Sequence, residues 1–492
     1  MSSTHPMLQP YRPTEDDPFD AVKAAHLLNR AGFGGTPAEI AAVMQQGPVG
    51  AVDNLLDFPD ASADEQSQTD VPDLSSIDGY PKSFRELRTM LQGKSQEEIK
   101  AARMKLMMAN REAIEAVMTW WLKRMSAGPH PLQEKLTLFW HGHFTTSAKD
   151  EKAASLIWNQ NELLRTQAAG NFRTFVRQIS RDPAMLDYLN NSENRKAHPN
   201  ENYARELMEL FTLGIGNYTE KDIKESARAF TGWAHDGDDF VFRKFDHDYG
   251  IKYFMGRSGN FDGDDIIDII LENPACPTFI AGELFTYFAY EQPEQSLATA
   301  LGAMLKQNNF ELRPLLRTIL TSRAFYSPAA VGTQIKSPIQ LVVGTTRLLE
   351  LPSPQGRQMT EPFKQMGQIP LMPPNVKGWP GGALWINTST LFVRYNTAVA
   401  MVGGGMGGGA GRGPIFNRVM EQRGGQFNPE TVGPHGTAEQ VVDGWVSRLI
   451  QRPIDDSKRQ VLLDALGEQD ENPQAVRRMI QLIVSMPEYQ LC

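Results

Sequence analysis

The segment HPNENYARELMELFTLG (residues 198–214) shows most clearly what kind of fold this chain forms. Asn200 is a residue type that often begins helices, and the apolar residues Tyr203, Leu207 and Phe211 then recur every fourth position. This spacing places the three side chains on one face of an α-helix and leaves the other face to polar residues. The segment therefore predicts an amphipathic helix that packs against a core.

Helical signals recur along most of the chain. Thr36 with Glu39 and Ser95 with Glu98 have the spacing of capping boxes, which begin helices. Residues 238–256 differ, because two aromatic or β-branched runs flank a polar turn, a pattern typical of a β-hairpin. The sequence thus predicts a mainly α protein, a multi-helix globular bundle with one small β-hairpin at about 238–256.

A glycine-rich run, GGGMGGGAGRG, occupies residues 403–413. It lacks the Lys-Ser/Thr pair of a phosphate-binding loop and follows no predicted strand, so we interpret it as a flexible tether. We therefore predict a main helical domain over 1–402 that includes the hairpin, a tether over 403–414, and a C-terminal helical segment over 415–492 that packs on the main domain.

Composition limits the classes of function. The chain has 492 residues and a net charge of −9, which gives no general attraction to nucleic acid or to anionic membranes, although a local basic patch stays open. Its two cysteines are too few for a disulfide framework or a thiolate zinc site. No leader peptide and no run of about 20 apolar residues is visible, so we expect a soluble cytoplasmic protein without membrane insertion. A chain whose leader had already been removed would look the same.

The first candidate site is the His-x-His pair, His141 and His143, in FWHGHF. Two positions apart on a continuous helix, the rings would point in opposite directions. If the helix ended at Gly142, both imidazoles could turn toward one metal ion. The alternative is one capping histidine and one packed histidine.

The second candidate is the carboxylate-rich face of the 198–214 helix. Glu201, Arg205 and Glu209 form one stripe, and Asn202 and Glu206 lie beside it. Two carboxylates three positions apart beside an arginine suit metal bridging or acid–base catalysis. The same pattern is also typical of an exposed, salt-bridged helix.

The remaining candidates lie later in the chain. Asp246, His247 and Asp248 place three ligand-type side chains in one predicted turn, with Lys252 following, although a solvated acidic turn would look alike. The segment 366–396 suggests a rigid loop that either walls a pocket or plugs the space between helices. Further pocket candidates are His198, Asn202, Lys252, Trp379 and Arg394.

Two functions remain open. In the first, the protein is an enzyme, a hydrolase or oxidoreductase, in which Glu206, Glu209, Arg205 and Asp248 are catalytic and a divalent metal is bound by His141, His143, Glu201 and His247. Its substrate would be a small molecule or a polymer. In the second, it is a non-catalytic binding or assembly protein, and the same polar residues form a buried structural salt-bridge network.

Several segments, in order, resemble the bacterial domain-of-unknown-function family 1800. They are HLLNRAGFGGTPAEI (26–40), FWHGHF (139–144), HPNENYARELMELFTLG, YTEKDIKESARAFTGW (218–233), HDYGIKYFMG, ILTSRAFYS (319–327) and GQIPLMPPNVKGWP. The resemblance spans nearly the whole chain and implies no established reaction. It implies that the candidate residues in these motifs belong together. It also implies a partner resembling an alkaline-phosphatase-type protein, because relatives occur beside such genes. Many relatives look exported, whereas this chain shows no leader.

Overall fold

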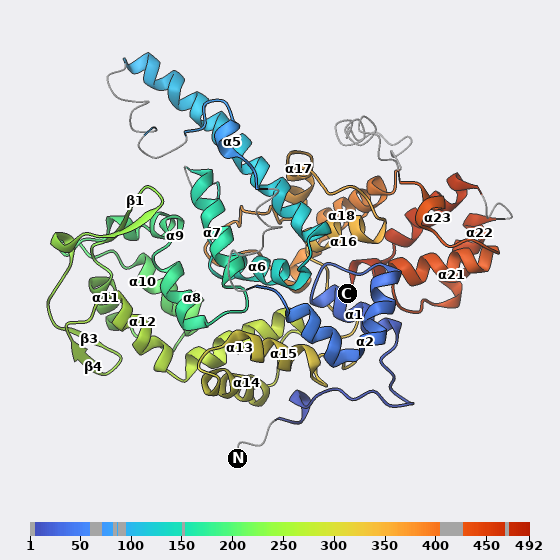
Figure 1. Ribbon diagram of the computed structural model, residues 1–492, viewed down its shortest axis with the longest axis horizontal. Helices are drawn as coiled ribbons and strands as arrows, with labels where there is room; N and C mark the ends of the chain where they lie inside the picture. The colour runs from blue at the N-terminus through green and yellow to red at the C-terminus, as the bar shows by residue number, and fades with distance from the viewer. Residues whose placement is uncertain are drawn as a thin grey trace.

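The computed structural model describes residues 5–59, 71–81, 86, 95–149, 153–403, 427–467 and 472–492. Helices dominate these residues, which confirms the predicted mainly α class (Figure 1). The predicted tether at 403–414 lies almost wholly outside the described residues, and the division into domains stays a prediction.

Fifteen helices make up the part of the fold before residue 349 that the structure describes. They are α1 (Ala21–Arg30), α2 (Pro37–Leu56), α5 (Gln96–Ala127), α6 (Pro131–His143), α7 (Ala154–Thr166), α8 (Phe172–Ile179), α9 (Pro183–Tyr188), α10 (Asn202–Glu206), α11 (Glu220–Ala229), α12 (Gly263–Glu272), α13 (Ala275–Phe288), α14 (Gln295–Gln307), α15 (Leu312–Thr321), α16 (Pro338–Leu348) and a π-helix, η4 (Leu207–Thr212). The described helices after these are α17 (Gly356–Met366), α18 (Thr388–Met401), α20 (Pro429–Val432), α21 (Ala438–Leu449), α22 (Asp456–Leu466) and α23 (Pro473–Val484).

The helix starts follow the predicted caps. Thr36 and Ser95 each accept the backbone N–H of the glutamate three positions on, and that glutamate's side chain returns to the cap's own N–H. Gly47 interrupts α2 with a φ of 70°, a left-handed conformation that glycine adopts easily. Local sequence thus determines these boundaries.

The strands near residues 238–256 form two small hairpins, whereas the sequence predicted one hairpin within that range. β2 (Asp239–Phe242) pairs antiparallel with the preceding β1 (Trp233–Asp236), and β3 (Lys252–Phe254) pairs with the following β4 (Arg257–Gly259). Each of the two runs therefore supplies one strand to a different hairpin, because each finds a closer partner across a short turn. Both hairpins lie at the left end of the molecule in Figure 1.

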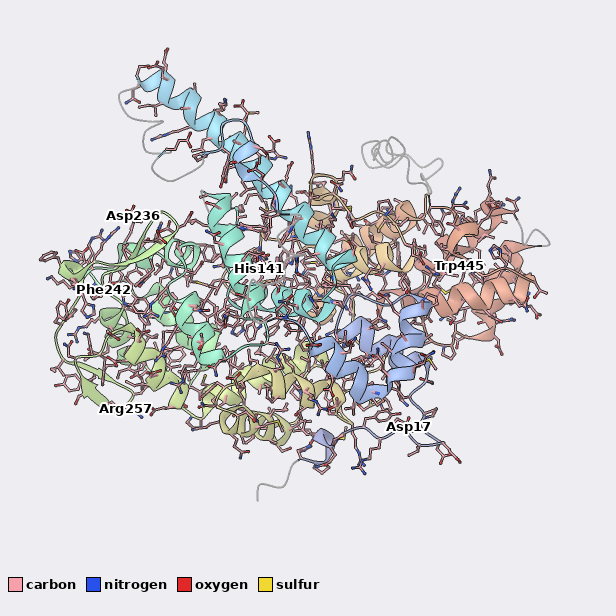
Figure 2. The ribbon with its side chains drawn as sticks, in the orientation of Figure 1. Asp17, His141, Asp236, Phe242, Arg257 and Trp445 are labelled. Carbon is pink, nitrogen blue, oxygen red and sulfur yellow. The ribbon has the colours of Figure 1, made fainter. Side chains whose placement is uncertain are left out.

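Buried residues form two hydrophobic clusters. One joins α1, α2 and α6 to helices α8 through α15, and includes Trp140 and Phe211. The other joins α5 to α16–α18 and α21–α23, and includes Trp121 and Trp445. α6 contributes to both clusters, and its last residues carry the His-x-His pair, so this candidate site lies where the two clusters meet (Figure 2). None of the helices in the described ranges is long and apolar enough to cross a bilayer.

Candidate functional site

The His-x-His pair does not converge. α6 continues through Gly142 to His143, so the two rings diverge as they do on a continuous helix, and the helix end at Gly142 that a shared metal ion would require does not form. His141 is buried, with its ring centroid 5.6 Å from that of Trp121 and 5.3 Å from that of Trp379. His143 points toward another neighbour, with Nε2 3.0 Å from the carbonyl oxygen of Phe211.

Burial makes both histidines neutral. It lowers the pKa of His141 to about 3 and that of His143 to about 4. A neutral His143 that carries its proton on Nε2 donates it to Phe211, a residue of the π-helix. His143 therefore joins the end of α6 to η4, and so links the FWHGHF segment to the 198–214 segment.

The 198–214 segment forms a short α-helix that widens into a π-helix. Asn200 Oδ1 accepts the backbone N–H of Asn202 at 3.0 Å, so Asn200 begins the helical segment from just outside it. From Leu207 to Thr212 the helix takes an extra residue per turn. Such π-segments are rare and often occur at functional sites.

Arg205 and Glu201 are engaged in an ion-pair network. Both terminal nitrogens of Arg205 lie 2.9 Å from the carboxylate of Glu220, and Nη2 lies 3.4 Å from Glu201. Glu220 is the first residue of α11, so the network ties α10 to that helix. These two candidate residues therefore have a structural role in this arrangement.

Glu206 and Glu209 are different. Burial and, next, the negative charge of Glu209 raise the pKa of Glu206, while Arg205 and Lys377 oppose the shift. No hydrogen bond or ion pair to the Glu206 carboxylate occurs within the described parts of the chain. Glu209 Oε2 accepts a hydrogen bond of 2.5 Å from the hydroxyl of Tyr218. Burial, together with that hydrogen bond, raises the pKa of Tyr218 to about 12, so the phenol keeps its proton and remains a donor.

The positive charge of Lys377 acts on Glu206 from a loop distant in sequence. The loop docks on α6 at two glycines, since a Cβ on Gly378 would lie 2.2 Å from the carbonyl oxygen of Gly142, and Gly378 has a φ of 76°. A Cβ on Gly142 would lie 3.7 Å from the Trp379 ring. The loop thus brings Trp379 to the end of α6, and it brings the charge of Lys377 near enough to Glu206 to act on its pKa.

The turn at 246–248 lies apart from this face and caps α11. The ring of His247 is buried, and its Nδ1 lies 2.8 Å from the carbonyl oxygen of Thr231. Asp248 pairs with Nε of Arg228 at 2.7 Å, and that contact lowers the pKa of Asp248. The ammonium of Lys252 bonds the backbone oxygen of Asp248. No contact links these residues to the Glu206 face in the described structure.

The other pocket candidates are also dispersed. His198 and Asn202 are exposed, whereas Arg394 is fully buried. Arg394 donates to Gln490 Oε1 and to the carbonyl oxygen of Lys336, both at 2.7 Å, and so fixes α18 against the end of the chain. Asn202 lies on the same helix as Glu206, four positions before it, and Trp379 lies against His141 and Gly142 at the end of α6.

The expected metal cluster is not assembled. In the residues that the structure describes, no group of three or more His, Cys, Asp or Glu side chains is placed to hold a metal ion. The physical reason is that each proposed ligand is turned to a different neighbour: His141 to tryptophans, His143 and His247 to backbone carbonyls, and Glu201 to Arg205.

A buried polar centre went unrecognised in the sequence. Glu134, which is 1% exposed, accepts hydrogen bonds from Nε of Arg124 at 2.6 Å and Nε of Arg165 at 2.8 Å. Its second oxygen accepts Trp121 Nε1 at 2.9 Å. Burial acts to raise the pKa of Glu134, but the two guanidinium groups outweigh it and leave the pKa below its usual value. Tyr218 and Lys377 were also missed, although both lie in motifs that the sequence singled out.

Comparison with known proteins adds one match. No curated protein and no solved structure matches the chain significantly. The family model described as "Protein of unknown function (DUF1800)" matches residues 26–491. The match covers the His-x-His segment, the Glu206 helix and the Lys377 loop alike, and the chain therefore belongs to the DUF1800 family.

Proposed function

We propose that the protein is a carboxylate-dependent enzyme, a hydrolase in which Glu206 and Glu209 act as an acid–base pair. The observation that carries this proposal is the environment of Glu206, a half-buried carboxyl with a raised pKa, next to a second carboxylate. Acid–base catalysis commonly uses two adjacent carboxyl groups whose surroundings give them different pKa values.

Glu206 holds its proton to higher pH than an ordinary glutamate, so it is suited to donate that proton to a leaving group. Glu209, whose Oε2 accepts a hydrogen bond from the Tyr218 hydroxyl, is the group to which we assign the role of base toward water. Lys377 supplies a positive charge near the pair, where negative charge would develop on a substrate.

Ion pairing supports the choice of these two residues over the other candidates. Glu201 and Asp248 each form an ion pair with an arginine, and that contact lowers the pKa of Asp248. Burial and the nearby charge of Glu209 instead raise the pKa of Glu206, and a carboxyl that holds its proton more tightly than usual is better suited to proton transfer.

The proposal is tested first without a substrate. In the titration of a ¹³C-labelled protein by NMR, Glu206 should have a pKa clearly above the ordinary value of about 4.3, and Glu209→Gln should lower it. Glu201→Gln on the same helix is the matched control and should leave the Glu206 pKa almost unchanged. A Glu206 that titrates normally in the wild type contradicts the proposal.

A panel of chromogenic esters, glycosides and phosphoesters then tests turnover. We expect one class to be hydrolysed, with the rate falling as pH rises through the Glu206 pKa, because the acid form is lost. Glu206→Gln should lower the rate by about 10²–10⁴-fold, the usual contribution of a general acid. Equal rates for Glu206→Gln and Glu201→Gln would count against the assignment.

A second function, as a non-catalytic binding or assembly protein, is favoured by a different observation. The motif residues Arg205 and Asp248 serve as ion-pair partners between elements, as that hypothesis expects. The NMR titration separates the two, because an assembly protein has no need of a raised Glu206 pKa.

A further inference from the structure

An exposed apolar surface lies at the end of the molecule that carries the two hairpins. Its members, which we call the aromatic rim, are partly or fully exposed large side chains within twelve residues of one another: Phe242, Phe245, Tyr249, Ile251 and Tyr253. Phe245 is 92% exposed and Ile251 is 53% exposed. Figure 2 labels Phe242 at this end, far from Trp445. Apolar side chains gathered in this way on a soluble surface usually mark a contact site.

The backbone of the rim is held in place by hydrogen bonds and by one buried ring. Arg243 N–H donates to the carbonyl oxygen of Gly232 at 2.7 Å, and Lys196 N–H donates to that of Asp246 at 2.8 Å. The buried ring of His247 lies between two rim rings, with centroids 5.2 Å from Phe242 and 4.7 Å from Tyr249. The exposure of the rim is therefore a property of an anchored segment.

Unpaired basic residues surround the rim. Asp246 lies 3.7 Å from Arg195, while Asp248 and Glu225 both pair with Arg228. Lys196, Arg243 and Lys244 are exposed, and none has an ion-pair partner among the described residues. Arg243 and Lys244 directly precede Phe245, so basic side chains adjoin the most exposed member of the rim although the whole chain carries −9, and a Debye length of about 8 Å at physiological salt screens acids that lie farther away.

We propose that the aromatic rim docks on the surface of an anionic lipid bilayer, with Phe245 entering the headgroup region and Lys196, Arg243 and Lys244 contacting lipid phosphates. Exposed aromatic and aliphatic side chains bordered by Lys and Arg are the chemistry of peripheral membrane attachment. Ile251 favours lipid over a nucleic acid or a polysaccharide, because an aliphatic side chain offers no ring for a base or a sugar to stack on. The inference is independent of the proposed acid–base site.

Flotation of the full chain with lipid vesicles tests the proposal. We expect binding to phosphatidylcholine vesicles that contain phosphatidylglycerol, little binding to phosphatidylcholine alone, and release by salt. Each basic residue near such a surface contributes about fivefold in affinity, so Arg243→Gln with Lys244→Gln should weaken binding roughly 25-fold. Phe245→Ala should weaken it about tenfold, the scale for withdrawing one large apolar side chain.

Phe392→Ala is the matched control, because Phe392 is also exposed, at 61%, but lies on α18 outside the rim. It should bind vesicles as the wild type does. Phe245→Cys labelled with an environment-sensitive dye should show a blue shift on anionic vesicles, and the two native cysteines are buried. Absence of vesicle binding, or binding that Phe245→Ala and Phe392→Ala affect equally, overturns the proposal. Phe245-dependent binding to a single-stranded oligonucleotide without vesicle binding overturns it as well and assigns the rim to nucleic acid.

Discussion

Replacing Glu134 by Gln should destabilise the protein more than the loss of any surface ion pair. The carboxylate is 1% exposed and accepts from Arg124, Arg165 and Trp121 at 2.6–3.0 Å. Breaking a buried ion pair by removing one partner costs about 3–5 kcal/mol, because the remaining charge is left uncompensated. Glu162 keeps part of the charge of Arg165 balanced, which places the expected cost toward the lower end.

The cost converts to a shift in melting temperature. An unfolding entropy of about 2.1 cal/mol/K per residue, summed over 492 residues, gives about 1 kcal/mol/K. A loss of about 3–5 kcal/mol then lowers Tm by about 3–5 °C if the chain unfolds as one unit, and by more if a smaller unit unfolds alone. Differential scanning calorimetry measures both Tm and the size of that unit.

Arg459→Gln is the control, because its pair with Asp443, at 2.7 and 2.8 Å, is solvent-exposed and worth about 0–1 kcal/mol. A difference in free energy of about 1 kcal/mol corresponds to about 1 °C in Tm by the same entropy. If Glu134→Gln melts within about 1 °C of this control, the argument from buried charge is refuted. A triple variant that replaces Arg124, Glu134 and Arg165 by apolar residues should recover most of the loss, since no unpaired charge then remains.

The pH dependence of this difference has a definite sign. The folded pKa of Glu134 lies below its unfolded value of about 4.3, so its stabilisation is complete above that pH and is lost as pH falls through the folded pKa. The gap in Tm between wild type and Glu134→Gln should therefore narrow under acid. A gap that widens on acidification would show that the shift has the opposite direction.

Two smaller perturbations separate structural roles that the sequence could not. Gly378→Ala should lower the free energy of unfolding by about 1–3 kcal/mol, because the new Cβ would meet the Gly142 oxygen at 2.2 Å and the φ of 76° strains any residue with a side chain. Gly381→Ala is the control and should change it almost not at all, because a Cβ there has nothing within 4 Å. Chemical denaturation of both variants measures the difference. Arg205→Ala should cost less than about 1 kcal/mol, because its pair with Glu220 is solvent-screened, and a fall in Tm as large as that of Glu134→Gln would contradict this.

Sequence patterns predicted those parts of the fold that depend on near neighbours. The caps at Thr36 and Ser95 hold because both partners of each capping box lie within four residues. The predicted strand pairing within 238–256 differs from the structure because the partner of β2 lies just before this range and the partner of β3 lies just after it. The π-helix carries no signal of its own, since Leu207–Thr212 would form an equally amphipathic α-helix.

The candidate site shows the same limit more sharply. Spacing identified Glu206 and Glu209 as neighbours, but it could not show that Tyr218 holds one of them or that Lys377 approaches from more than 160 positions away. Likewise, FWHGHF does not show that His141 packs against Trp379 while His143 bonds the carbonyl oxygen of Phe211. Such contacts depend on the tertiary fold.

Ion pairing is what distinguishes the carboxylates that share this sequence pattern. Glu201 forms an ion pair with Arg205 along the same helix, and Asp248 forms one with Arg228 that lowers its pKa and ties the 246–248 turn to α11. Glu206 lies near the charge of Glu209, so ionising one carboxylate disfavours ionising the other. Glu206 is therefore the carboxylate that we propose for acid–base chemistry on this part of the fold, and a substitution that removes Glu209 should lower the Glu206 pKa only in part, because burial, the larger cause of the shift, remains.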